Sequence, residues 1–322
     1  MKSRHRLVLS VSALLLALTG CGSGEGTPGE AADASLSVAA SFYPLQHAAE
    51  QVGGDHAEVT NLTKPGAEPH DLELTPNQVL DVSRADALVY LKGFQPSVDD
   101  AAKEAGDSAF DVSSAARLDI EAPQEEGHEG ETAEEHAAHA GEEKDNDDGA
   151  VDPHFWLDPT RYADVVDAIA ERFAEADPAH AADYRANAKE FTGELTTLDK
   201  DLKAGLADCR SQDLVTGHTA FAYFADRYGF HQESVSGLSP DTEPSPSALA
   251  DLIKHVKQER VDTVYAETLV PADVARTIAR DSGAKVAVLD PLEGLTDQSA
   301  GSDYVEVMRS NLATVRKGQG CS

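Results

Sequence analysis

Short apolar runs and longer amphipathic runs alternate along the chain from residue 36 onward. The first half has apolar, strand-like runs at residues 36–42, 58–62 and 87–91. Helical patterns lie between them at residues 44–52 and 76–82, and each begins with a proline, which suits the first turn of a helix. Strands that alternate with helices predict a parallel sheet with helices on its faces.

The second half repeats this pattern. Strands are expected at residues 214–216, 261–266 and 286–289, and helices at 219–228, 247–259, 274–279 and 304–312. Residues 158–207 between the halves are strongly helical, with one break at Asp177-Pro178. The fold class expected is α/β, with two Rossmann-like lobes, 35–177 and 208–322, joined by a long rigid helix at 178–207.

The first residues have the features of an export signal. Lys2, Arg4 and Arg6 precede a charge-free apolar stretch that is too short to span a bilayer, and Leu-Thr-Gly-Cys follows, ending at Cys21. This segment resembles a bacterial lipobox. It predicts a signal peptide at 1–20, a lipidated Cys21 and a tether at 21–34 that anchors the chain outside the cytoplasm.

Net charge and cysteine content limit the partners that the chain can bind and predict a disulfide. There are 26 Lys and Arg against 58 Asp and Glu, a formal net charge of −32, which argues against nucleic acid and anionic membrane surfaces as partners. Contact with the membrane is therefore expected only through the lipid anchor. Outside the cytoplasm, the two remaining cysteines, Cys209 and Cys321, are expected to form a disulfide, with two free thiols as the alternative.

Three of the twelve histidines lie next to residues that restrict the backbone. His70 and His154 each lie in a proline-flanked loop, and His218 follows a predicted strand through Gly217. In α/β folds such loops assemble ligand sites at the mouth of a crevice. Three imidazoles with a carboxylate or a water suit zinc, although these spacings alone are not diagnostic. Five others are interpreted as surface or half-buried residues: His47, His56, His180, His231 and His255.

Several segments together resemble one known family. They are Ser-Phe-Tyr-Pro at 41–44, Glu-Pro-His-Asp at 68–71, Asp-Pro-His-Phe-Trp-Leu-Asp-Pro at 152–159, Gly-His-Thr-Ala-Phe at 217–221, Gly-Leu-Ser-Pro at 237–240 and Leu-Asp-Pro-Leu-Glu-Gly-Leu at 289–295. On these residues the chain is similar to the metal-specific solute-binding proteins of ABC importers, the ZnuA/AdcA/TroA-like group. The resemblance runs from about residue 36 to 315.

The resemblance implies a metal site in the cleft between the lobes. His70, His154 and His218 match the three imidazole ligands, and Glu293 matches the position of the family's carboxylate. Asp290 and a bound water are alternatives for the fourth place. Glu267 either contacts one of the ligands without binding the metal itself or is simply a carboxylate at the end of a strand.

The resemblance also implies the cargo and the partners. A histidine at position 218 favours Zn²⁺ as cargo, whereas manganese-type members tend to have a carboxylate there. The partners expected are an ABC permease and its ATPase, and the chain is expected to be a monomer and not an enzyme. The alternatives are a manganese or iron carrier, a zinc hydrolase with three histidine ligands, and a lipid-anchored adhesin.

One segment belongs to neither lobe. Residues 121–148 are almost entirely Glu, Asp, Gly, Ala and His, and include His128, His136 and His139. Too little apolar surface is present for a packed core, so an unstructured loop is expected. Its histidines are either a secondary, low-affinity zinc collector or part of a solvated insertion with no role.

Overall fold

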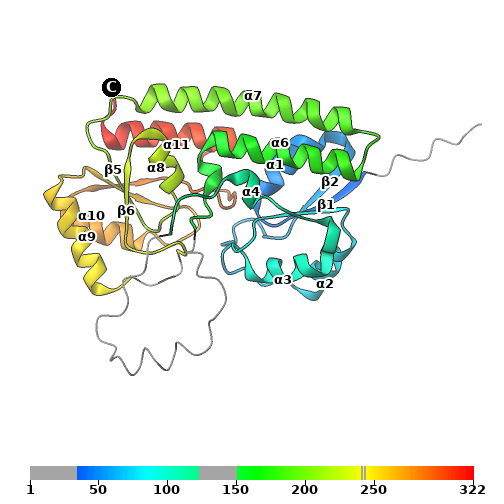
Figure 1. Ribbon diagram of the computed structural model, residues 1–322. Coiled ribbons are helices and arrows are strands. Elements are labelled where there is room, and N and C mark those ends of the chain that lie inside the picture. Colours follow the sequence, from blue (N-terminus) through cyan, green and yellow to red (C-terminus); the bar gives the residue numbers. More distant parts are fainter. Residues whose placement is uncertain (1–34, 123–150, 241, 243) are drawn as a thin grey trace, which may run out of the picture. The chain divides into compact units, whose positions relative to one another are not determined.

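A computed structural model describes residues 35–122, 151–240, 242 and 244–322. The predicted signal peptide, Cys21, the tether and the three histidines of the acidic segment lie outside the described residues. Residues 35–322 form one compact unit (Figure 1). None of the described helices is both long enough and apolar enough to cross a membrane.

The first half contains a parallel sheet in the order β2-β1-β3-β4. Its strands are β1 (Leu36–Ala40), β2 (Ala57–Asn61), β3 (Ala87–Tyr90) and β4 (Ala109–Asp111). The accompanying helices are α1 (Tyr43–Gly53), α2 (Pro76–Arg84), α3 (Pro96–Ala105) and α4 (Ser113–Ala116), with short 3₁₀ turns η1 (Gly54–His56), η2 (Gly106–Ser108) and η3 (Phe155–Leu157).

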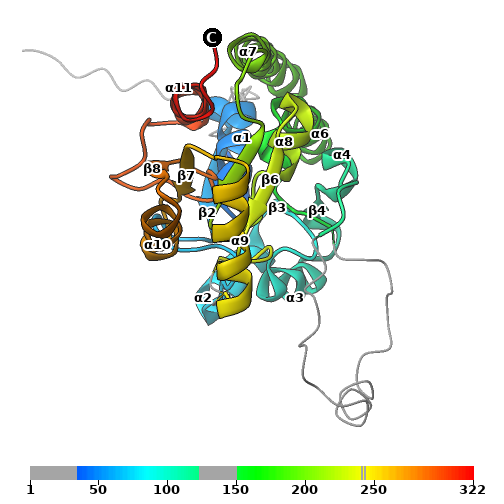
Figure 2. The same ribbon diagram turned by 90° about the vertical axis from the view of Figure 1, so that its left-hand side faces the viewer.

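The second half has the equivalent order, β6-β5-β7-β8, again all parallel. Its strands are β5 (Asp213–Thr216), β6 (His231–Ser234), β7 (Thr263–Ala266) and β8 (Lys285–Val288). Its helices are α8 (Ala222–Tyr228), α9 (Pro246–Gln258), α10 (Asp273–Ser282) and α11 (Tyr304–Gln319). Figure 2 shows α10 and α11 on opposite sides of β7 and β8. The predicted α/β fold class with two parallel sheets is confirmed.

Two long helices connect the halves, α6 (Pro159–Ala176) and α7 (Ala181–Leu206). Helix α6 ends just before Pro178, whose ring and missing N–H oppose continuation of a helix. Helix α7 packs against α1 and α6 from the first half and against α8 and α11 from the second (Figure 1). A single helix therefore packs against helices of both halves.

Local sequence signals explain where many helices begin and end. Helix α2 has a capping box in which Thr75 and Gln78 each bond the other's backbone N–H, and Asp158, Ser245 and Asp303 cap α6, α9 and α11. Proline occupies the first turn of α1, α2, α3, α6 and α9. The capping side chains accept from N–H groups that a helix start leaves without intrahelical partners, and a proline in the first turn has no N–H to satisfy.

The sequence patterns missed α3, α4, β4 and β6, and they placed one helix start too early. Helix α8 begins at Ala222 rather than at residue 219. The preceding residues are held as a loop because the Thr219 N–H donates to the Gly237 carbonyl and the Ala220 N–H donates to the His218 carbonyl. This leaves His218 in a loop at the end of β5 instead of in a helix.

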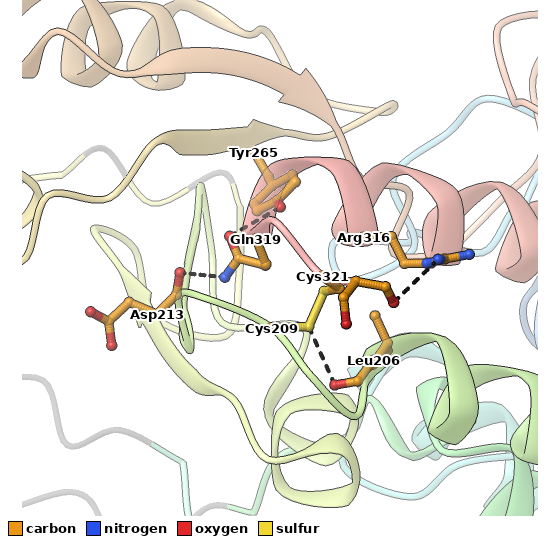
Figure 3. Close-up of a disulfide and its surroundings, with 8 residues drawn as sticks. Leu206, Cys209, Asp213, Tyr265, Arg316, Gln319 and Cys321 are labelled. Atoms are coloured by element: carbon orange, nitrogen blue, oxygen red, sulfur yellow. Dashed lines mark hydrogen bonds between the residues drawn. A yellow bond between two sulfur atoms is a disulfide. The ribbon is translucent and has the colours of Figure 1, made fainter.

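The C-terminus is tied to the start of the second half. Cys209 and Cys321 form a disulfide between residues 112 positions apart, as Figure 3 shows. Next to it, the Gln319 amide donates to the Asp213 carbonyl at 2.8 Å, and the Tyr265 hydroxyl donates to Gln319 Oε1. Helix α11 is thereby fixed against β5 and β7.

Candidate metal site

Four side chains from distant parts of the chain converge on one point. Glu293 Oε1 lies 3.3 Å from His70 Nε2 and 3.2 Å from Nε2 of both His154 and His218. One potential ligand atom from each of the four residues lies within 4.8 Å of all the others. Within the described parts of the chain, this is the one such cluster of His, Cys, Asp or Glu. Its donors suit a transition metal that accepts imidazole and carboxylate ligands.

His70 comes from the loop after β2. The Glu68 carboxylate accepts the His70 backbone N–H at 3.0 Å, and the buried Gln95 amide donates to the Pro69 carbonyl at 3.0 Å. The imidazole lies against the ring of Phe94, with centroids 4.6 Å apart. The loop and the ring are thus oriented by groups that do not belong to the converging set.

His154 lies in the loop that precedes η3 and is fully buried. Asp152 Oδ1 accepts from the His154 backbone N–H at 2.7 Å and lies 2.9 Å from the ring Nδ1. A carboxylate at Nδ1 favours the tautomer that has its proton on Nδ1 and leaves Nε2 available as a ligand. Trp156 packs beside the ring, with centroids 5.2 Å apart.

His218 has the same kind of support from the second lobe. Glu267, which follows β7, contacts His218 Nδ1 through Oε2, while its Oε1 accepts the backbone N–H groups of Gly217 and His218. A side chain at Gly217 would crowd this carboxylate, because a Cβ there would lie 3.0 Å from Glu267 Oε1. The structure therefore favours a supporting role for Glu267 over an incidental strand-end carboxylate.

The site lies where the carboxyl ends of parallel strands meet. His218 follows β5, Glu267 follows β7, and the segment with Glu293 follows β8. These three strands are neighbours in the second sheet. His70 follows β2 in the first sheet, and His154 precedes the long helices, so the site joins the two halves. Open α/β sheets place ligands at this edge.

Burial and charge shift the pKa values in the cluster. Burial lowers the pKa of His70. For His218, burial also disfavours the charged ring, but the Glu267 and Glu293 carboxylates outweigh it and raise its pKa well above the usual 6.5. The pKa of His154 is raised in the same way, chiefly by Asp152. Burial opposes ionisation of Glu293, yet the imidazoles, His218 foremost, lower its pKa well below 4.5.

The alternative carboxylate, Asp290, is not part of the converging set. Its Oδ1 accepts the backbone N–H of Leu292 at 2.8 Å, and its Oδ2 is buried without a hydrogen-bond partner among the described residues. Burial raises the pKa of Asp290. Glu293, three residues later, is the carboxylate that faces the imidazoles.

One interpretation of the other histidines was wrong. His47 is buried, not half-buried or exposed, because its ring lies among Tyr43, Phe191 and Tyr304. Apart from Pro44 at the start of α1, nothing in the nearby sequence marks its position, and the side chains that cover it come from α7 (Phe191) and α11 (Tyr304). The histidines at 56, 180, 231 and 255 are partly or largely exposed, as expected.

Supporting residues were harder to recognise than the histidines. Asp152 lies in the proline-flanked segment of His154, but the sequence analysis assigns it no contact with the histidine ring. Gln95 has no sequence signal at all, because it contacts Pro69 only after α3 is packed. A carboxylate two residues before a loop histidine is the one local feature that points to Asp152.

Comparison with known proteins supports the resemblance seen in the sequence. A family model described as "Zinc-uptake complex component A periplasmic" (ZnuA) matches residues 38–318. The zinc-binding protein AdcA of Streptococcus pyogenes serotype M3 is 36% identical over 289 residues, which cover 88% of this chain and 56% of AdcA. The chain therefore spans about half the length of that relative.

Two further proteins match along nearly their whole length. The high-affinity zinc uptake system protein ZnuA of Bacillus subtilis is 33% identical over 313 residues, which cover 96% of this chain and 95% of that protein. The crystal structure of the Zn(II)-bound ZnuA-like domain of Streptococcus pneumoniae AdcA is 30% identical, with a TM-score of 0.70, covering 88% of this chain and 99% of that domain. The matches in sequence and in fold agree, and this chain belongs to the ZnuA family.

Proposed function

We propose that this chain is the extracytoplasmic component of an ABC importer that binds Zn²⁺ as cargo. The proposed ligands are His70, His154, His218 and Glu293. The observation that carries the proposal is their convergence, in which one carboxylate oxygen lies 3.2 to 3.3 Å from three imidazole nitrogens. Three imidazoles and one carboxylate suit the tetrahedral geometry of zinc.

The surroundings of the ligands support capture rather than catalysis. His154, His218 and Glu293 are almost completely buried, which limits the access of a substrate to a metal held there. Catalytic zinc sites keep a position for water or substrate, whereas four protein ligands fill a tetrahedron. A zinc hydrolase is therefore less well supported than a zinc carrier, and we propose that the chain is not an enzyme.

The remaining parts of the proposal concern the chain's surroundings. We propose a signal peptide at 1–20, a lipidated Cys21 and a tether at 21–34. They would hold the lobes 35–177 and 208–322, with their link at 178–207, on the outer side of the cell membrane. The partners are an ABC permease and its ATPase, and the chain acts as a monomer. Cys21→Ala should release the protein from the membrane fraction.

We propose His128, His136 and His139, which lie outside the described residues, as secondary, low-affinity zinc ligands. Replacing all three with alanine should leave the tight site intact and remove only weak zinc binding. A loss of the tight site in that variant would contradict the assignment of its four ligands.

The central test is a competitive titration of the mature protein with Zn²⁺ and Mn²⁺ against a chromogenic chelator. One tight zinc site per chain is expected, with zinc affinity strongly reduced in His218→Ala and in Glu293→Gln. His231→Ala is the matched control, because that side chain is 72% exposed and does not belong to the converging set. Tight manganese binding, or zinc binding that is indifferent to His218→Ala, would overturn the proposal.

A further inference from the structure

The turn that presents Glu293 is held from several sides. Asn311 on α11 accepts the Asp290 backbone N–H at 3.0 Å and donates to the Asp290 carbonyl at 2.7 Å. The Trp156 indole N–H donates to the Pro291 carbonyl at 2.8 Å. Trp156 lies in η3, next to His154, so this bond links the turn to the segment that presents another proposed ligand.

The next residue has an unfavourable backbone conformation. Leu292 has φ +58°, in the left-handed region that a residue with a branched, bulky side chain rarely adopts. Its side chain is completely buried in the main core. Something must therefore hold Leu292 in this conformation, because an unrestrained leucine would leave it.

Asp290 is positioned to supply that restraint. Its Oδ1 accepts the Leu292 backbone N–H at 2.8 Å, which closes the turn two residues ahead. The Asp290 side chain is only 3% exposed, so water does not readily replace this bond. The turn sets the direction in which the next residue, Glu293, leaves the backbone.

Glu293 faces the imidazoles through one carboxylate oxygen. All three contacts use Oε1, and none uses Oε2. A carboxylate held in this way offers one oxygen to a metal. A carboxylate free to rotate would offer both oxygens, which suits cations with a larger ligand number such as Mn²⁺.

We propose that Asp290, acting through the left-handed Leu292, is a positioning residue that limits Glu293 to one-oxygen ligation and so favours zinc over cations that need more ligands. This inference rests on the proposed function. It assigns Asp290 a role in metal discrimination without direct contact with the metal.

The test compares Asp290→Ala with Asp290→Asn. Asparagine keeps an oxygen that accepts the Leu292 N–H, whereas alanine has none. Asp111→Ala is the matched control, because Asp111 Oδ1 also accepts an N–H two residues ahead, from Ser113 at 3.0 Å, at the end of β4. Zn²⁺ and Mn²⁺ affinities are measured by chelator competition, and the visible spectrum of the Co²⁺-loaded protein reports the ligand number.

Asp290→Ala should weaken zinc binding about tenfold, since the energy of holding one residue left-handed corresponds to a factor of this size. Manganese affinity should change less, so that the preference for zinc falls, and the intense visible bands of four-coordinate Co²⁺ should weaken. Asp290→Asn and Asp111→Ala should behave like the wild type. Equal zinc affinity and an unchanged Co²⁺ spectrum in Asp290→Ala would overturn the inference.

If Asp290→Ala fails to fold, a second pair of variants tests whether the left-handed conformation of Leu292 controls the preference for zinc. Leu292→Ala and Leu292→Gly remove nearly the same packing, but only glycine tolerates positive φ. Leu292→Gly should keep the preference for zinc better than Leu292→Ala, and equal preferences would contradict the inference. If the wild type itself lacks tight zinc binding, the proposed function fails; if the wild type binds zinc and these variants match it, only the present inference fails.

Discussion

Individual histidines in this protein differ in what surrounds their rings. His154 and His218 each have a carboxylate at Nδ1 and Glu293 at Nε2, whereas the ring of His47 lies against aromatic rings. The same side chain is therefore a proposed metal ligand in one place and a neutral packing residue in another.

The raised pKa of His218 predicts proton release on zinc binding. Because the pKa of His218 is raised above its usual 6.5, the metal-free ring keeps its proton to a higher pH than an ordinary histidine does, and zinc must displace that proton. Zinc affinity should therefore keep rising as the pH rises above 6.5, instead of levelling off near the usual histidine pKa. Calorimetry in two buffers of different ionisation enthalpy should show proton release, reduced in His218→Ala. An equal release by both proteins would contradict this assignment.

His47 makes a separate prediction about acid stability. Burial lowers its pKa to about 4. Below pH 6.5 the unfolded chain therefore binds a proton at His47, whereas the folded protein does not until the pH approaches 4. The buried, neutral ring contributes fully to the free energy of unfolding above pH 6.5. About 3 kcal/mol of this contribution is lost as the pH falls to 4. Urea unfolding of the metal-free protein should show a smaller loss in His47→Gln. The exposed His231→Gln is the control, and an equal loss in both variants would refute the idea.

At the level of elements, two glycines in helices differ in whether packing requires them. Gly318 lies on α11 where the helix crosses β7, and a Cβ there would overlap the buried hydroxyl of Tyr265. Gly193 lies within α7, where a Cβ would have no atom within 4 Å. The first glycine permits a close approach of two elements, whereas the second has no such function.

These two positions should respond oppositely to alanine. Gly318→Ala should destabilise the protein by about 1–3 kcal/mol, because either α11 or Tyr265 must shift. Gly193→Ala should stabilise it by about 0.5–1 kcal/mol, because alanine is the better helix former. Chemical denaturation of both variants measures the difference. A stabilised Gly318→Ala would show that α11 is not packed on β7 as described.

For the described unit as a whole, one apolar core extends through both halves. Val38 and Val89 of the first sheet belong to the same cluster as Leu214 and Tyr265 of the second. Helices α1, α6, α7 and α11 contribute to it, while separate smaller cores lie on the other face of each sheet. A shared core makes large independent movement of the two lobes costly, because movement would expose apolar surface.

The disulfide acts on the same scale. It closes a loop with a sequence separation of 112 residues, which contains the entire second sheet. Replacing both Cys209 and Cys321 with serine should lower the free energy of unfolding by about 3–5 kcal/mol in the chain-entropy model, while zinc affinity stays unchanged. Denaturation with and without reductant checks the first expectation, and chelator competition checks the second. A large loss of zinc affinity would indicate that the disulfide also shapes the site.

Much of the fold was readable from local pattern. The β/α alternation, the break before Pro178 and the prolines at helix starts are signals that act within a few residues. Strands β4 and β6 were missed because they are short and only partly buried at sheet edges, so neither has a continuous apolar run. Local sequence carries little information when an element is completed mainly by its neighbour.

Local sequence signals were enough to predict the α/β class and the loops that present His70, His154 and His218, since proline, glycine and strand ends mark such loops locally. Tertiary structure alone decided that Glu293 rather than Asp290 faces the imidazoles, and that Asp152 and Glu267 support them. Glu293 and His70 are 223 residues apart, and their contact exists only once the second sheet is packed beside the first. The burial of His47 was decided in the same way, because the side chains that cover it come from other helices.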